Sequence, residues 1–296
     1  MPFPLGSITR QFSSVETRSF ARLDKTGSTR KYPSMPVFPN RRRPSTHRGT
    51  AIGFALLVAL SGCSAIQTEA PKVDPAAAEK LYLHGRTLAA EGRAHEAIDA
   101  YHASINAAPG FAMAYYDLGN QYAKLGRYEP AIESYRRAIR ADPELLKAYN
   151  NLGLAYTANG APEKAVIVLR RATALSPRYA RAWNSLGSAY DVLREHPKAI
   201  MTFKEAIKID PDYADAYNNL GGAYLSLHLH REAKEAFLRA LRLAPKDTNA
   251  LFNLGKLYAA LGERGQAQAQ LNELENLDPW KADALRKAIR QSAAIR

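Results

Sequence analysis

The stretch Trp183-Asn184-Ser185-Leu186-Gly187-Ser188-Ala189-Tyr190 opens a segment that ends at Pro211, and the same pattern recurs along the chain. Six prolines follow one another at intervals of 34 residues without an insertion or deletion: Pro109, Pro143, Pro177, Pro211, Pro245 and Pro279. This period is typical of helix-turn-helix units that bury their apolar faces only against neighbouring units. The sequence therefore predicts an all-α array of six stacked helix pairs.

Each unit, counted from 31 residues before its proline, is expected to hold two helices. Large apolar or aromatic side chains recur at positions 4 and 11, and spacings of three, four and seven place them on one face of the first helix together with a glycine at position 8. The second helix carries alanine at position 20 and a large side chain at position 24. The glycines are Gly85, Gly119, Gly153, Gly187, Gly221 and Gly255, and the large side chains at position 24 are Tyr101, Tyr135, Leu169, Phe203, Phe237 and Leu271.

The glycine column requires a packing reason, because a glycine within a helix costs about 0.5–1 kcal/mol relative to alanine. Without a Cβ at position 8, the second helix of the unit can approach closely. We therefore predict that the large side chain at position 24 lies over each glycine. The proline at position 32 ends the second helix. A second set of glycines marks the turn within a pair, where a left-handed residue is easily accommodated: Gly92, Gly126, Gly160 and Gly262.

Residues 78–279 resemble the tetratricopeptide repeat (TPR) family in these glycine, alanine, aromatic and proline columns. The resemblance implies a right-handed solenoid of six repeats, at 78–111, 112–145, 146–179, 180–213, 214–247 and 248–281. Leu285, Ala288 and Ile289 then copy the apolar face of a first helix. Residues 282–296 are therefore expected to form a C-terminal capping helix that covers the last apolar face.

The resemblance also implies a binding groove, because in this family positions 2, 5, 6 and 9 of the first helices point into a concave surface. Asparagine dominates its middle, and a row of amides that donate and accept could bind an extended peptide backbone without demanding a sequence. The alternative is that asparagine at position 6 is simply common in such repeats. The side chains expected in the groove are Tyr82, Arg86, Met113, Tyr116, Asn120, Lys147, Asn150, Asn151, Arg181, Asn184, Ser188, Asp215, Asn218, Asn219, Asn249, Phe252, Asn253 and Lys256.

Some eukaryotic relatives hold a terminal carboxylate with a clamp of lysine, asparagine, asparagine, lysine and arginine. Asn120, Asn151 and Arg181 match three of its places if arginine replaces lysine, but Tyr116 and Ser185 interrupt the other two. That clamp is therefore not expected.

The chain before the repeats has the features of an export signal. Arginines at 41–43 and 48 precede the apolar run 51–60, which is too short for a spanning helix of about 20 residues. Leu60-Ser61-Gly62-Cys63 resembles a bacterial lipobox, and Cys63 is the only cysteine of the chain. The resemblance implies a signal peptide at 35–62, cleaved before a Cys63 that carries several acyl chains, enough for stable anchoring.

The usual length of a signal peptide, about 15–30 residues, suggests that translation begins at Met35 and that residues 1–34 are an extension. The arginine triplet lacks the flanking residues of a twin-arginine signal. Residues 63–77 are expected to form a polar tether. Ser64 resembles the sorting signal for the outer membrane, which implies that the repeats face the periplasm; in a cell with one membrane, the same anchor would leave them outside.

The charge of the chain does not favour nucleic acid as a partner. The net charge is +13, but residues 1–62 hold ten Lys/Arg and two Asp/Glu, so only +5 remains for the repeats. The sequence contains no glycine-rich phosphate loop, metal-ligand cluster or nucleophile with a placed base. His228 and His230 flank Leu229, but no third ligand accompanies them. We expect no enzyme activity, no cofactor and no metal.

These features together predict an exported, lipid-anchored scaffold that binds a peptide or protein in the groove. Six repeats behind a lipidated cysteine resemble the TPR lipoproteins that assist type IV pilus assembly by delivering the secretin to the outer membrane. Two alternatives remain: an adaptor for cell-wall hydrolases or other envelope complexes, and a targeting module for an envelope polysaccharide synthase or glycosyltransferase.

Overall fold

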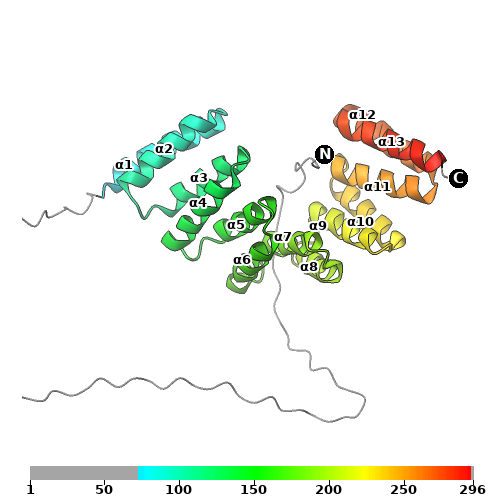
Figure 1. The fold of residues 1–296 in the computed structure, drawn as a ribbon, viewed down its shortest axis with the longest axis horizontal. Helices are drawn as coiled ribbons and strands as arrows, with labels where there is room; N and C mark the ends of the chain where they lie inside the picture. The colour runs from blue at the N-terminus through cyan, green and yellow to red at the C-terminus, as the bar shows by residue number, and fades with distance from the viewer. Residues whose placement is uncertain (1–72, 295–296) are drawn as a thin grey trace, which may run out of the picture. The chain divides into compact units, whose positions relative to one another are not determined.

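The computed structural model describes residues 73–294. The predicted extension, the signal peptide, Cys63 and the tether as far as residue 72 lie outside the described residues. Within 73–294 the regular structure consists of thirteen α-helices and no strand (Figure 1). The helices are α1 (Pro75–Ala90), α2 (Ala94–Ala107), α3 (Ala112–Lys124), α4 (Tyr128–Ala141), α5 (Leu146–Ala158), α6 (Pro162–Leu175), α7 (Ala180–Val192), α8 (His196–Ile209), α9 (Ala214–Ser226), α10 (His230–Leu243), α11 (Thr248–Leu261), α12 (Arg264–Leu277) and α13 (Pro279–Ala294).

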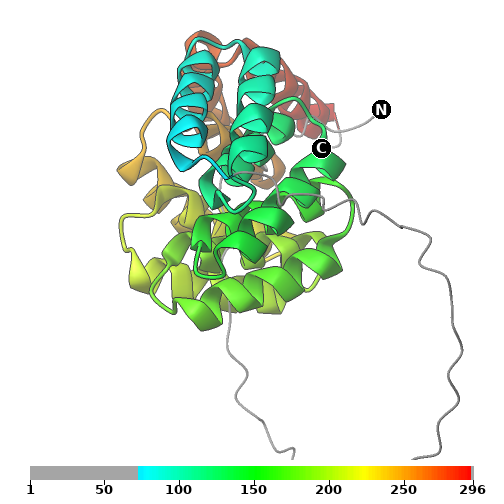
Figure 2. The same cartoon turned by 90° about the vertical axis from the view of Figure 1, so that its left-hand side faces the viewer.

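The helices form the six stacked pairs that the period predicts. Each odd-numbered helix from α1 to α11 packs on the even-numbered helix that follows it, and each pair packs on the next pair (Figures 1 and 2). The odd-numbered helices also contact one another in series, from α1 with α3 to α9 with α11. They therefore make one continuous layer, which we call the first-helix surface. The predicted all-α solenoid is confirmed.

The glycines at position 8 allow the second helix of each pair to pack closely against the first, as the sequence predicts. In the first five repeats, a Cβ added at the glycine would lie 2.4 to 2.8 Å from the side chain at position 24. The alanines at position 20 are completely buried in all six repeats. In the sixth repeat the nearest side chain is different, because Leu285 of α13, and not Leu271, would lie 2.5 Å from a Cβ on Gly255. In the sixth repeat a side chain of the capping helix therefore covers the glycine, while α12 still packs on α11.

The turns within the pairs need a left-handed residue in every repeat. Gly92, Gly126, Gly160 and Gly262 adopt φ values of 71° to 80°, as predicted. In the fourth and fifth repeats the same position is occupied by Arg194 and His228, both with φ of 58°. Since an L residue is disfavoured there by about 1–2 kcal/mol, these two turns are locally strained.

The two ends of the array begin earlier than the predicted boundaries. Helix α1 starts at Pro75, not at residue 78, because the Asp74 carboxylate accepts a hydrogen bond from the Ala77 amide at 2.9 Å and proline suits the first helical turn. Helix α13 starts at Pro279, three residues before the expected cap. Its Leu285 is buried in one cluster with Leu251, Leu271, Leu274 and Ala282. In the part of the chain that the structure describes, no helix has the length and apolarity to cross a bilayer.

Candidate peptide-binding groove

A ladder of side-chain hydrogen bonds joins neighbouring repeats across the first-helix surface. At each step, position 5 of one repeat meets position 6 of the next, 35 residues later. The five steps are Tyr82 Oη donating to Asp117 Oδ2 (2.8 Å), Asn151 Nδ2 to Tyr116 Oη (3.2 Å), Ser185 Oγ to Asn150 Oδ1 (2.9 Å), Asn219 Nδ2 to Asn184 Oδ1 (3.1 Å) and Asn253 Nδ2 to Asn218 Oδ1 (3.1 Å).

The ladder changes the interpretation of the asparagine row. The side chains of Asn150 and Asn184 are 5% and 0% exposed, and Ser185 is also fully buried. Their polar groups are satisfied between repeats, as buried amides and hydroxyls generally are. Asn150 and Asn184 therefore offer little surface to a ligand in this structure, and the alternative of a structural role for asparagine describes them better. Asn218, Asn219 and Asn253 are only half-buried and keep an accessible face.

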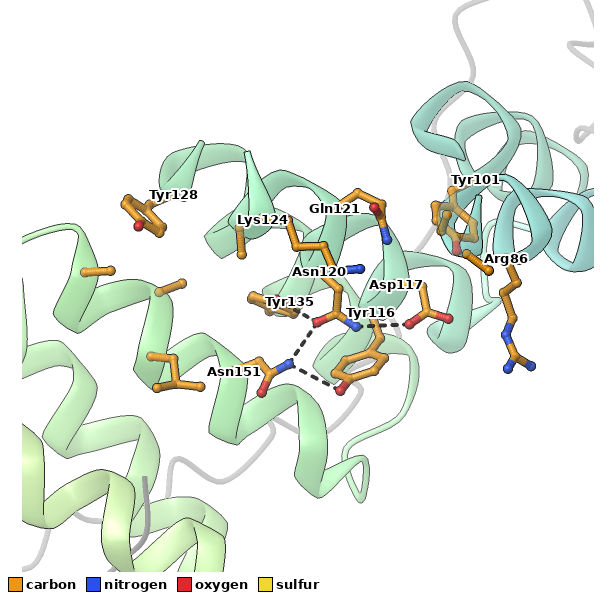
Figure 3. A pocket seen from close by; sticks show the side chains of 16 residues that line it. Arg86, Tyr101, Tyr116, Asp117, Asn120, Gln121, Lys124, Tyr128, Tyr135 and Asn151 are labelled. Atoms are coloured by element: carbon orange, nitrogen blue, oxygen red, sulfur yellow. Dashed lines mark hydrogen bonds between the residues drawn. The ribbon is translucent and has the colours of Figure 1, made fainter. Parts of the chain in front are cut away.

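A pocket of about 590 Å³ is lined mainly by residues of α1, α3 and α5, with Tyr101 of α2 and Tyr128 and Tyr135 of α4. Four of the predicted groove residues line it, namely Arg86, Tyr116, Asn120 and Asn151 (Figure 3). Its volume lies within the range of about 300–1,000 Å³ found for ligand pockets. The predicted groove thus includes a real hollow at its N-terminal end.

Asn120 lies at the centre of the polar wall of this pocket (Figure 3). Its Oδ1 accepts hydrogen bonds from the Tyr135 hydroxyl at 2.9 Å and from Asn151 Nδ2 at 2.8 Å. Its Nδ2 donates to Asp117 Oδ1 at 3.0 Å. Because every member is bonded to another, the network fixes the wall before any ligand arrives.

Asp117 and Lys124 are polar pocket residues that the sequence prediction omitted, and Asp117 could have been included. It lies at position 6 of the second repeat, so the same rule that selected Asn151 should have selected it. Its two carboxylate oxygens accept from Tyr82 and Asn120. Asp117 lies 35 residues after Tyr82, which is the separation between position 5 of one repeat and position 6 of the next, so the contact between them could have been inferred from the sequence.

The tyrosines around the pocket remain neutral donors. Burial raises the pKa of Tyr101 to about 12, and the nearby Asp117 carboxylate adds to the effect. The pKa of Tyr82 is raised further by burial, by the hydrogen bond that Tyr82 donates to Asp117 and by the negative charge of Asp117. Burial likewise raises the pKa of Tyr116 and of Tyr135. Since ionisation is moved away from neutrality, all four hydroxyls keep their protons at physiological pH.

The remaining predicted residues lie on the same layer beyond the pocket. Lys147, Arg181 and Lys256 are exposed, and the Lys256 ammonium lies 5.4 Å from the centre of the Phe252 ring. The other five residues of this set are half-buried, namely Met113, Ser188, Asp215, Asn249 and Phe252.

No metal-binding group appears among residues 73–294, since no three histidine, cysteine or acidic side chains gather there. The His228 and His230 rings lie 6.0 Å apart at the start of α10, without a third ligand.

Three family models match the chain. The model described as TPR repeat matches residues 119–160 and 195–227. A model described as tetratricopeptide repeat matches residues 214–247. Another model with that description matches residues 146–179 and 248–279. No curated protein matches the chain in sequence.

Many solved structures resemble this one. A MamA protein is 32% identical, with 57% of this chain and 93% of that chain covered and a TM-score of 0.51. TTC0263, a TPR protein of Thermus thermophilus, is 29% identical over 61% of this chain and 98% of its own, with a TM-score of 0.52. The pilF protein of Pseudomonas aeruginosa, at 17% identity, shares the fold with a TM-score of 0.59 over 71% of this chain and 97% of its own.

Proposed function

This chain is a tetratricopeptide repeat protein, and from that premise we propose that it is a scaffold which binds a peptide or protein partner at the pocket of its first-helix surface. Such repeats serve as protein-interaction scaffolds, and the family is generally not catalytic. The observation that carries the proposal is the pocket of about 590 Å³ between α1, α3 and α5, whose polar wall is held in place by Asn120. A preformed site avoids part of the entropy that binding otherwise loses.

We further propose that lipid on Cys63 holds this scaffold at the outer membrane, with the repeats in the periplasm. The support is the leader itself: arginines, a short apolar run and the sequence Leu60-Ser61-Gly62-Cys63 in that order. A secretin-delivery role in pilus assembly is the task that this architecture suggests. The likeness to the pilF structure concerns the fold alone, so the adaptor and targeting roles are tested beside it.

The anchor is tested with Cys63→Ala in cells that export the protein. The variant should lose labelling by a fatty-acid analogue and leave the membrane fraction, while the unchanged chain keeps both. Membrane partitioning that persists without Cys63 would contradict the anchor.

The binding surface is tested by placing one photocrosslinking residue at either of two positions. Tyr128 lines the pocket and is itself aromatic, whereas Ile167 lies on the second helix α6 and is 70% exposed. Crosslinks to a defined partner should form from position 128 and not from position 167. The partner's identity, as a secretin, a wall hydrolase or a polysaccharide enzyme, separates the three roles. Crosslinks from position 167 alone would move the binding surface to the second helices.

A further inference from the structure

We propose that the pocket receives one large apolar side chain of the partner, and that Arg86 and Lys124 pair with carboxylates on either side of it. The partner segment would then be an acidic stretch with a bulky apolar residue within it. This inference rests on the proposed function, because it specifies the ligand of the same pocket.

The interior of the pocket is shaped for an apolar group. Alanine recurs around its floor, at Ala89, Ala90, Ala123, Ala155 and Ala158, and the space follows from these short side chains. Leu154 and the rings of the surrounding tyrosines complete a lining that is mostly apolar. Burying an apolar side chain in such a space gains about 25 cal/mol per Å² removed from water. Large apolar and aromatic residues are the side chains that gain most from it.

The hydrogen-bonded network of Asp117, Asn120 and Asn151 does not require a polar ligand group. Both oxygens of Asp117 already accept hydrogen bonds, from Tyr82 and from Asn120. The Asn120 carbonyl oxygen already has two donors, and the Asn151 amide nitrogen already donates to Asn120 and to Tyr116. An apolar side chain can therefore enter without leaving a buried polar group of this network unpaired, which is the usual penalty for such a contact.

The charged groups at the pocket indicate the flanking residues of the ligand. Arg86 and Lys124 are exposed, and within residues 73–294 neither is within ion-pair distance of a carboxylate. The pocket's acidic side chain, Asp117, accepts from the neutral Tyr82 and Asn120, so the carboxylates of the ligand must lie at Arg86 and Lys124 and away from Asp117. A carboxylate of the partner would therefore meet a cation that has no competing ion pair.

The first-helix surface continues this pattern beyond the pocket. Lys147, Arg181 and Lys256 are exposed and, among the described residues, form no ion pair. On the second helix α4, by contrast, the arginines surround Glu133, whose carboxylate lies 3.0 Å from Arg137 and from Arg140. An acidic segment that runs along the first helices would meet these three cations and, between Arg181 and Lys256, the half-buried Asp215. The excess of positive charge favours both the rate and the specificity of association.

Three fluorescein-labelled synthetic peptides of equal length test the inference against the full-length protein by fluorescence anisotropy. The first carries a tryptophan between aspartate and glutamate residues, the second replaces the tryptophan with alanine, and the third replaces the acids with lysine. We expect the first to bind at least about tenfold more tightly than either of the others, which corresponds to about 1.4 kcal/mol.

Protein variants then locate the binding of the first peptide. Ala158→Trp should fill the pocket and abolish binding, and Arg86→Glu with Lys124→Glu should weaken it by at least about tenfold. Arg170→Glu with Arg171→Glu, two exposed changes on α6 away from the pocket, is the matched charge control and should leave binding unchanged. Circular dichroism of each variant confirms that it has folded.

Two results would overturn the inference. Equal binding of all three peptides would exclude the stated specificity, and an equal loss from the Arg170→Glu, Arg171→Glu control would show that only general charge matters. The proposed function is contradicted by a different result, the absence of partner crosslinks from position 128. If those crosslinks form while the acidic tryptophan peptide does not bind, the scaffold stands and the ligand class is wrong.

Discussion

Two adjacent glycines of α9 should respond in opposite ways to the same substitution. At Gly221, an added Cβ would lie 2.6 and 2.7 Å from two atoms of the Phe237 ring, and at Gly222 it would meet nothing within 4 Å. Carbon atoms normally pack about 3.5–4.0 Å apart, so the ring would have to retreat by about 1 Å. Phe237 is 0% exposed, so its ring cannot turn out into solvent without disturbing its buried neighbours.

The expected magnitudes follow from this geometry. Overpacking of a core costs about 1–3 kcal/mol, and alanine regains about 0.5–1 kcal/mol over glycine inside a helix. Gly221→Ala should therefore lower the free energy of unfolding by about 0.5–2 kcal/mol. Gly222→Ala should raise it by about 0.5–1 kcal/mol. The two variants have the same composition, so they differ only in what the new methyl group contacts.

Urea unfolding followed by circular dichroism measures both changes as shifts of the midpoint at constant slope. In a Phe237→Ala background the ring is gone, and Gly221→Ala should become neutral or stabilising, with a coupling energy of about 1–3 kcal/mol. If Gly221→Ala stabilises the protein as much as Gly222→Ala does, the close approach of the helices is not what selects glycine at position 8.

Three further outcomes can be measured in the same way. Arg194→Gly and His228→Gly should each raise the free energy of unfolding by about 0.5–1 kcal/mol, since glycine relieves the left-handed turn. Gly262→Ala should lower the free energy of unfolding. If neither Arg194→Gly nor His228→Gly is more stable than the unchanged protein, these two turns are not strained. Stability should be full below pH 10 and fall toward pH 12, because the unfolded chain releases the Tyr101 proton at its usual pKa of 10.0 and the folded chain holds it to about 12. Tyr101→Phe should reduce that alkaline loss by about 1–3 kcal/mol, and an unchanged profile would refute the assignment. Leu285→Ala should cost about 2–5 kcal/mol and expose α11 and α12 to hydrogen exchange, while equal loss of protection in α1 would argue against repeats that depend only on their neighbours.

The sequence was sufficient for the architecture because each repeat contacts only its neighbours. Gly187 and Phe203 stand in the same unit, so their meeting could be inferred from one 34-residue pattern. The contact between Gly255 and Leu285 could not be inferred this way. It joins the last repeat to α13, which is not part of a repeat. Whether Leu271 or Leu285 covers Gly255 depends on how α13 packs on α11 and α12.

The candidate site was less predictable, because a residue type does not reveal its partner. Asn184 and Asn218 occupy equivalent positions, yet Asn184 is fully buried whereas Asn218 is half-buried. Position alone indicated that both belong to the first-helix surface. Their exposure depends on the side chains that the adjoining repeats supply. The pocket was also invisible in the pattern, since it arises from alanines at positions that the repeat leaves variable.

The ladder has a consequence for how the length of this protein can change. Every step links residues 35 apart, so an in-frame removal or duplication of 34 residues leaves position 5 of one unit facing position 6 of the next. Removal of residues 185–218, for example, would bring Asn184 opposite Asn253, which is again a pair of amides, as in the present contact between Asn184 and Asn219. Genetic recombination between repeats could thus lengthen or shorten the binding surface by whole units while each new junction inherits a compatible contact.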